Sequence, residues 1–355
     1  MASEPVVVVR VGMMTAVGLS AAETAASVRS ATMRFQESSF RDHRHEPVTL
    51  AGVPDDGVPP LRDDLEHQWL TNRERRTVCL ATQPLLECVR SVPAGEPPPP
   101  LVLALSDRET RRPLKAEPFL RWLEAQTGGG FDVKASDAAH RGRAGGLAAI
   151  GRAADLLRSG RARFVVAGGV DSHRDAYVLA RLDVLEKRVK SAAHLDGFIP
   201  GEGAGFVLLA TRSAAAAAGL APQAAVSPVV EAVEPGHLQG DEPYRGEGLA
   251  AAVGRLATSG TAPGPVQEVY SSMNGESYWA KEWGVALVRN SGAFAAQHRM
   301  HHPADCFGDT GAACGPLMLG LAALGIRDGY RRSPALVYAS SDTGARAAVL
   351  VTAAS

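Results

Sequence analysis

Short apolar runs recur along the chain, and each is followed by a glycine-containing segment and a longer stretch of mixed polarity. The runs are continuous and rich in valine and leucine, which is typical of strands covered on both faces by helices. This pattern predicts four strands in the first part of the chain, at 6–9, 101–105, 164–167 and 206–209. A short strand is also predicted at 131–133.

The stretches between these runs predict helices at 20–30, 70–92 and 147–159. In the last of them, apolar side chains recur near every 3.6 residues, and Gly160 follows as the residue that ends the helix. Pro84 predicts a kink or break in the second helix. Strands that alternate with helices indicate an α/β protein built in layers.

Glycine-rich segments predict the connections between these elements. We expect turns at 12–15, 140–146 and 168–169, and a glycine-flanked turn at 201–205 before the fourth strand. Residues 38–66 are polar and rich in proline, histidine and aspartate, so they predict a surface loop with small excursions.

The second part of the chain repeats the order of strand, helix and glycine turn. It predicts a strand near Val269, helices at 276–288 and 316–324, a glycine turn at 308–315, and final strands at 335–339 and 347–352. This repetition predicts two similar halves, residues 1–212 and 220–355, with the alanine run 214–218 between them.

Composition and charge exclude several classes of function. The 355 residues are 45% hydrophobic and carry a formal net charge of −1 without a block of one sign, so nucleic-acid binding is not expected. No apolar run approaches the roughly 20 residues of a membrane helix, and the N-terminus does not resemble a secretory signal. The four cysteines form no CxxC pair, so we expect reduced thiols in a cytoplasmic protein, with no membrane partner and no metal site.

Four segments together resemble the β-ketoacyl synthase branch of the thiolase superfamily, in that family's order. They are VVVVRVGMMTAVG at 6–18, GLAAIGRAADLLRSGRARFVVAGGVD at 146–171, DGFIPGEGAGFVLL at 196–209 and GDTGAACG at 308–315. The resemblance spans nearly the whole chain. It implies an α/β fold of five layers, αβαβα, built from two similar halves, and it implies a dimer.

The resemblance also implies where the catalytic residues of the family would lie. The nucleophilic cysteine falls seven residues before Ile150, at Arg143, which cannot act as a nucleophile. The two assisting positions, histidine or asparagine in the family, fall on Asn274, with Met273 as the alternative, and on Asp309. Asp342 lies near the place of the family's gatekeeper phenylalanine.

By the same analogy, Arg143, Asn274 and Asp309 converge in one pocket, and the cation and the acid form an ion pair. A pocket of this kind has lost its nucleophile, yet Arg143, Asn274, Asp309 and Asp342 remain candidates for substrate binding. Glu202, in the GEGAG segment, is expected to anchor the backbone rather than to react.

Other groups near the fourth segment suggest weaker alternatives. Cys306 and Cys314 flank Asp309, and either is a candidate for a relocated nucleophile, although buried structural cysteines are commoner. His301, His302 and Asp305 precede the same turn, but their spacing does not favour a metal site. Glu276 is expected to cap the helix that follows it.

These observations predict a catalytically degenerate ketosynthase-like protein, a scaffold, adaptor or partner subunit in an acyl, biosynthetic or secretion system. The expected partners are a second copy, a ketosynthase-like subunit or an acyl carrier protein, with no cofactor. The alternative is an acyltransferase or acyl-thioester-binding enzyme in which Arg143 binds a carboxylate or phosphate and Asp309 acts as a general base. A third interpretation is an active ketosynthase that uses Cys306 or Cys314.

Overall fold

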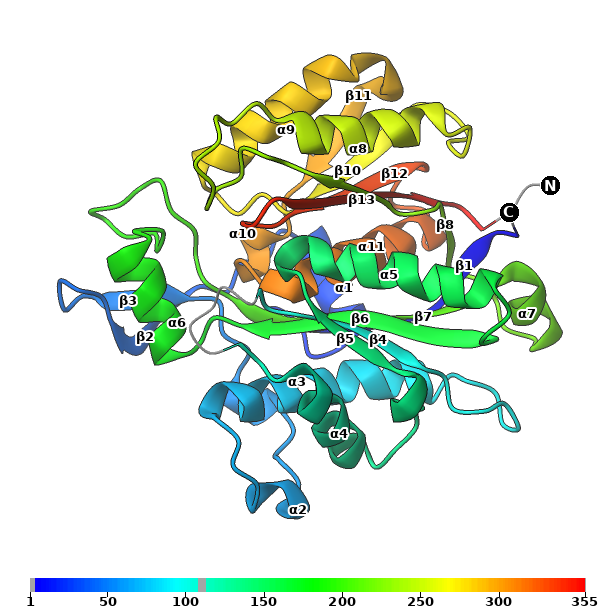
Figure 1. The fold of residues 1–355 in the computed structure, drawn as a ribbon, viewed down its shortest axis with the longest axis horizontal. Helices are drawn as coiled ribbons and strands as arrows, with labels where there is room; N and C mark the ends of the chain where they lie inside the picture. The colour runs from blue at the N-terminus through cyan, green and yellow to red at the C-terminus, as the bar shows by residue number, and fades with distance from the viewer. Residues whose placement is uncertain (1–3, 108–112, 355) are drawn as a thin grey trace.

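The computed structural model describes residues 4–107 and 113–354, which fold into five stacked layers in the order helix, sheet, helix, sheet, helix (Figure 1). This is the arrangement that the sequence resemblance implies. The last strand of one sheet layer pairs with the last strand of the other. Hydrogen bonding therefore continues from one layer into the next.

The first half of the chain supplies one layer of strands. They are β1 (Val6–Thr15), β4 (Leu101–Leu105), β5 (Asp137–His140), β6 (Phe164–Ser172) and β7 (Glu202–Thr211). Their order across the layer is β5-β4-β6-β7-β1. The first two pairings in this order are parallel and the last two are antiparallel.

The second half repeats this layer with the same pattern. Its strands are β8 (Ala224–Val226), β9 (Val230–Val233), β10 (Val266–Ser271), β11 (Phe294–His301), β12 (Ala335–Ser340) and β13 (Ala345–Thr352). The order β11-β10-β12-β13-β8 again begins with two parallel pairings and ends with two antiparallel ones. This repeat supports the division at 212–220, where the short helix α7 (Arg212–Ala217) lies, and we propose that division as the boundary.

Helices fill the space between the sheets and cover both outer faces (Figure 1). The middle layer contains α1 (Ala21–Arg29), α5 (Gly142–Arg158) and α11 (Cys314–Arg327). The outer helices are α3 (Asn72–Val89) and α4 (Ala116–Thr127) on one side and α8 (Glu247–Thr258) and α9 (Ser277–Arg289) on the other.

The two central helices approach each other closely, and glycine makes this possible. A Cβ atom on Gly146 of α5 would lie 2.2 Å from Pro316 Cδ in α11 and 2.8 Å from the carbonyl oxygen of Ala312. The start of α5 therefore packs directly against the segment before α11. Through this contact the two halves meet at the centre of the molecule.

Several glycines that predicted turns lie inside strands instead. The segment 12–15 belongs to β1, Gly168 and Gly169 belong to β6, and 202–205 belongs to β7. The reason is close packing: a Cβ on Gly12 would lie 2.0 Å from the Pro84 carbonyl oxygen, and one on Gly169 would lie 2.2 Å from that of Ala312. These glycines admit a neighbouring backbone rather than reverse the chain.

The predicted turn at 140–146 and the predicted strand at 131–133 are also wrong. The strand β5 ends at His140, and α5 begins at Gly142, five residues before the predicted helix start. Only Gly142 in this segment has a positive φ, of 59°. Residues 133–135 form a single helical turn, because the Asp132 carboxylate accepts the N–H groups of Lys134 and Ala135.

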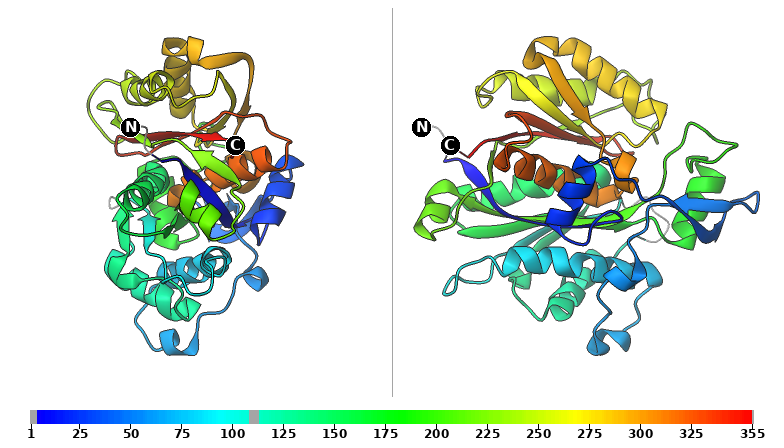
Figure 2. Two further views of the ribbon diagram at one scale, coloured as in Figure 1. Left: turned by 90° about the vertical axis from the view of Figure 1, so that its right-hand side faces the viewer. Right: turned by 180° about the vertical axis from the view of Figure 1, so that it is seen from behind.

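The helix α3 continues past Pro84, which lies buried inside it, so the predicted break at this residue is absent. Residues 38–66, predicted as loop, contain regular elements. These are part of the hairpin β2 (Gln36–Arg41) and β3 (Pro47–Leu50), a helical turn η1 (Asp55–Gly57) and the short helix α2 (Asp63–Glu66). The hairpin projects from the side of the layers beside α6 (Ala176–Ala180) and the helical turn η3 (Arg181–Leu185) (Figure 2).

Candidate functional site

The N-terminus of α5 lies at the centre of the candidate site. The backbone N–H of Ala144 donates to Ser341 Oγ at 2.9 Å, and Ser341 Oγ donates to the Arg141 carbonyl oxygen at 2.6 Å. Ser341 begins the loop between β12 and β13, so this loop caps the first turn of α5. The cap fixes the backbone of the next residue of interest, Arg143.

Arg143 points from this turn into a group of acidic residues. Its Nη1 donates to Asp309 Oδ2 at 2.5 Å, its Nη2 donates to Asp342 Oδ1, and its Nε donates to the Ser340 carbonyl oxygen at 2.8 Å. The guanidinium group also lies over the ring of Trp279, 4.4 Å from its centroid. The predicted ion pair between Arg143 and Asp309 is therefore present, and every nitrogen of the guanidinium has a partner.

Asp309 is held on all sides by donors. Besides Arg143, Asn274 Nδ2 donates to Asp309 Oδ2 at 2.7 Å and the Gly311 N–H donates to Oδ1 at 2.8 Å. Burial alone opposes ionisation of this carboxyl, but Arg143, His173 and these hydrogen bonds outweigh it and hold the pKa of Asp309 well below its ordinary value. Asp309 is thus a stable carboxylate rather than a base that takes up a proton near neutral pH.

Arg188 is a second arginine in the network, and the sequence did not predict its role. It makes two hydrogen bonds to Glu276, at 2.6 and 2.8 Å, and donates to Asp342 Oδ2 at 2.7 Å. Burial lowers the pKa of Arg188, but the carboxylates of Asp342 and Glu276 raise it by more. The sequence KRVKS around Arg188 is typical of an exposed basic loop, so only its buried partners reveal it.

Glu276 differs from its predicted role. It occupies the N-cap position of α9, but its side chain makes no capping hydrogen bond. Its carboxylate instead accepts from Arg188, from Asn274 Nδ2 at 3.0 Å and from Trp279 Nε1 at 2.9 Å. Glu276 thus binds Arg188 directly. It is linked to Arg143 through Asn274, which also donates to Asp309, and through Trp279, whose ring faces the Arg143 guanidinium.

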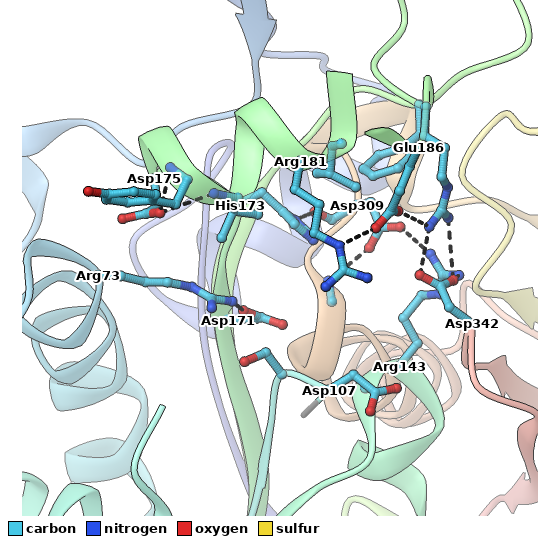
Figure 3. Close-up of a pocket in the computed structure, with 18 of the residues that line it drawn as sticks. Arg73, Asp107, Arg143, Asp171, His173, Asp175, Arg181, Glu186, Asp309 and Asp342 are labelled. Atoms are coloured by element: carbon cyan, nitrogen blue, oxygen red, sulfur yellow. Dashed lines mark hydrogen bonds and ion pairs between the residues drawn. The ribbon is translucent and has the colours of Figure 1, made fainter. Parts of the chain in front are cut away.

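A pocket opens beside this network (Figure 3). Arg143, Asp309 and Asp342 lie on one side of it, and the buried pair of Arg73 and Asp171, 2.8 Å apart, lies on the other. The cavity volume is about 90 Å³, which holds several water molecules or a small acyl group. The lining also includes Ser106, Asp107, His173, Asp175, Tyr177, Arg181, Glu186, Arg188 and Phe198.

The four cysteines are buried and do not line this pocket. Cys314 comes nearest, with its Sγ 3.7 Å from the Arg143 carbonyl oxygen, but burial raises the pKa of its thiol far above the ordinary value. Burial also raises the pKa of Cys306 to about 11. A thiolate is the reactive form of cysteine, so neither residue is poised as a relocated nucleophile.

Two further predicted residues have structural partners. Glu202 is fully buried and accepts from Val53 N, Ser172 Oγ and the Arg76 guanidinium, which supports its expected role as a backbone anchor. His301 Nε2 lies 2.7 Å from a carboxylate oxygen of the buried Glu268. His301 thus pairs with an acid of its own sheet rather than with His302 or Asp305.

Comparisons with known proteins agree with this architecture. Residues 142–215 match the model of the β-ketoacyl synthase N-terminal domain. No curated protein matches the sequence at a significant level. The match begins at the first residue of α5, so it includes Arg143 and the helix that carries it.

Solved structures share the fold over the whole chain. The ishigamide ketosynthase/chain length factor is 16% identical with a TM-score of 0.80, covering 100% of both chains. A type II PKS ketosynthase in complex with its acyl-carrier protein, AntDE:AntF, is 15% identical with a TM-score of 0.79, covering 99% of this chain and 100% of the other. The oxazolomycin ketosynthase domain OzmH KS7 of Streptomyces albus JA3453 is 17% identical with a TM-score of 0.76, covering 99% and 75%. The predicted thiolase-like fold is confirmed.

Proposed function

Because the chain has the ketosynthase fold and a β-ketoacyl synthase N-terminal segment, we propose that it is a non-catalytic ketosynthase-like subunit. It acts as a scaffold or partner of an active ketosynthase in a system that builds or carries acyl chains. The sequence prediction of an adaptor in a biosynthetic or secretion system belongs to the same class of function. We keep the cytoplasm as the expected location. Among the helices of residues 4–107 and 113–354, none has both the length and the hydropathy that a membrane crossing requires.

One observation carries this proposal. The N-terminus of α5, where the resemblance implies a cysteine nucleophile, presents Arg143 instead, and Arg143 is sealed by Asp309, Asp342 and a backbone carbonyl. A thioester carbonyl that entered this place would meet a guanidinium group that already has partners and no nucleophile. The fold is retained while the chemistry of its centre is replaced by ion pairs.

The edge of the sheet supports a partner subunit. Within the described residues, β5 pairs only with β4, so its outer edge has backbone groups available to another strand. Two of the similar structures are a ketosynthase/chain length factor and a ketosynthase in complex with its acyl-carrier protein. We therefore propose pairing with a ketosynthase-like subunit, or with a second copy, and contact with an acyl carrier protein.

The proposal is tested by incubating the folded protein with acyl-CoA and acyl-carrier thioesters and measuring its intact mass. We expect no covalent adduct, because no described thiol or hydroxyl is activated at the α5 N-terminus. Variants Cys306→Ala and Cys314→Ala are run in parallel. A stable adduct that disappears in one of these variants would show that a nucleophile survives and would overturn the proposal.

The alternative function, an acyl-thioester-binding enzyme built on Arg143 and Asp309, divides into two parts. The low pKa of Asp309 does not support its use as a general base. The paired guanidinium groups of Arg143 and Arg188 do favour binding of an anionic group, because planar guanidinium groups suit carboxylates. This second part can be taken further.

A further inference from the structure

The Asp342 carboxylate is bound between two arginines. Arg143 Nη2 donates to its Oδ1, while Arg188 donates to Oδ2 at 2.7 Å and to Oδ1 at 3.3 Å. Two guanidinium groups around one carboxylate form a complete recognition site for that group. The carboxylate belongs to the loop between β12 and β13, so this chain supplies both the site and its occupant.

Asp342 is also the most accessible acid of the network. Its side chain is 26% exposed, whereas that of Asp309 is 3% exposed and that of Glu276 is 7% exposed. It borders the pocket, and Figure 3 shows it at the pocket wall next to Arg143. A ligand that enters the pocket would therefore meet Asp342 before either buried acid.

We propose that Arg143 and Arg188 form a carboxylate-binding site, and that Asp342 fills it as a tethered ligand which an external carboxylate replaces. The ligand class is a small organic acid or the terminal carboxylate of an acyl thioester. The inference deepens the proposed function and rests on it, since the site binds an acyl group's carboxylate without reacting with it.

The arginines remain in place when Asp342 leaves, because each has a separate anchor. Arg143 keeps Asp309, the Ser340 carbonyl oxygen and the face of Trp279. Arg188 keeps its two hydrogen bonds to Glu276. A site that is already organised loses little conformational entropy when it binds, which favours exchange.

The exchange also preserves charge. One carboxylate leaves the arginines and one arrives, so the buried charges stay balanced throughout. Only the loop tip has to move. Thr343 Oγ1 holds this tip by donating to Asp107 Oδ2 at 2.6 Å, while Ser341 stays fixed to α5.

The experiment removes the tethered carboxylate and supplies a free one. Variants Asp342→Ala and Asp342→Asn are titrated calorimetrically with malonate and acetate, and with acetamide as a neutral probe. We expect saturable binding of both acids to Asp342→Ala, about tenfold or more tighter than to the parent protein, and no acetamide binding. Asp328→Ala, which removes an exposed acid paired with Arg327, is the matched control and should bind as the parent does.

A second arm distinguishes a free acid from an acyl thioester. Malonyl-CoA that binds Asp342→Ala more tightly than malonate assigns the site to acyl thioesters, and acetyl-CoA should then bind more weakly because it lacks the carboxylate. Adding Arg188→Met to Asp342→Ala should abolish all carboxylate binding.

Equal binding to Asp342→Ala and to Asp328→Ala would overturn the inference. If Asp342→Ala does not fold alone, refolding in malonate but not in acetamide supports the site, and failure in both overturns it. These titrations need no partner subunit and no covalent adduct, so their failure leaves the proposed partner role standing. Adduct formation in the mass experiment would overturn the proposed role separately.

Discussion

The two central helices occupy equivalent places in the two halves but begin in opposite ways. Helix α5 follows the outer strand β5, and α11 follows the outer strand β11. The first turn of α5 places Arg143 among carboxylates, whereas α11 begins with Cys314, the first of twelve buried residues among its fourteen. One helix is fixed at its start by ion pairs and the other by apolar packing, although the surrounding strands are arranged alike. The two halves share the same arrangement of strands and helices, but of these two helices α5 carries the ion-pair network at its N-terminus.

The largest expected effect comes from breaking the ion pairs at α5. Arg143→Met leaves the buried Asp309 without its cation, while Asp342 keeps Arg188, and we expect a loss of about 3–5 kcal/mol in the free energy of unfolding because a buried carboxylate remains unpaired. Denaturant unfolding measures this loss. Arg152→Ala on the same helix is the control, since its pair with Asp137 is 60% and 57% exposed and should contribute about 0–1 kcal/mol. Equal effects of the two variants would contradict the assignment.

An apolar truncation in α11 tests the other side of the comparison. Leu317→Ala removes a fully buried side chain from the middle layer, and we expect a loss of about 2–4 kcal/mol from the lost burial and the cavity. This loss should be the same between pH 3 and pH 5, whereas that of Arg143→Met should shrink in this range as the acids that Arg143 stabilises become protonated. Unfolding curves at several pH values distinguish the two. A pH-dependent loss for Leu317→Ala would mean that packing and ion pairs are coupled.

The acids at α5 should make stability fall in mild acid. The pKa values of Asp309 and Asp342 are both lowered in the folded protein: burial raises them, but the neighbouring arginines lower them by more. Their contribution is therefore fully present above the unfolded value of about 3.9 and is lost as the pH falls below it toward the folded values. In Asp342→Asn the free energy of unfolding should decline less steeply between about pH 5 and pH 3. An unchanged slope would show that Asp342 does not titrate with folding.

The smallest effect is expected at Cys314. Its raised thiol pKa and its burial predict that a thiol reagent at pH 8 labels it only when the protein unfolds. Labelling monitored by mass, with urea-unfolded protein as the control, checks this. Rapid labelling of the folded protein would place the start of α11 nearer to solvent than the structure does.

The sequence predicted the fold well where apolar runs are long. The strands at 6–9, 101–105 and 164–167 were found because they are buried on both faces, which leaves continuous apolar runs. The strand β11 was missed because it lies at a sheet edge, and the exposed Gln297 and Arg299 and the half-buried His298 interrupt its apolar pattern. Edge strands lack the signal that buried strands carry.

Part of the candidate site was also predicted, but from the family resemblance rather than from apolar runs. Arg143, Asn274 and Asp309 were found because they replace residues in motifs that the resemblance supplies, and the structure brings them together with Asp342. Arg188 belongs to no such motif, so its contact with Glu276 across 88 residues of sequence could not be predicted. Their role in substrate binding remains a prediction. Local patterns determine which elements form, whereas pairs of distant charges depend on how those elements pack.

The ion-pair network also bears on how the chain folds. Arg143 and Arg188 lie in the first half, and Asp309, Asp342 and Glu276 lie in the second. Separated at residue 212, the first fragment would carry Arg143 and Arg188 with only Glu186 beside them, and the second would carry three acids without either arginine. We expect each fragment to be unstable alone but opposite in charge to the other at this site, so mixing them should restore a folded particle. We therefore expect the duplicated framework to unfold as a single cooperative unit whose halves recognise each other through opposite charge.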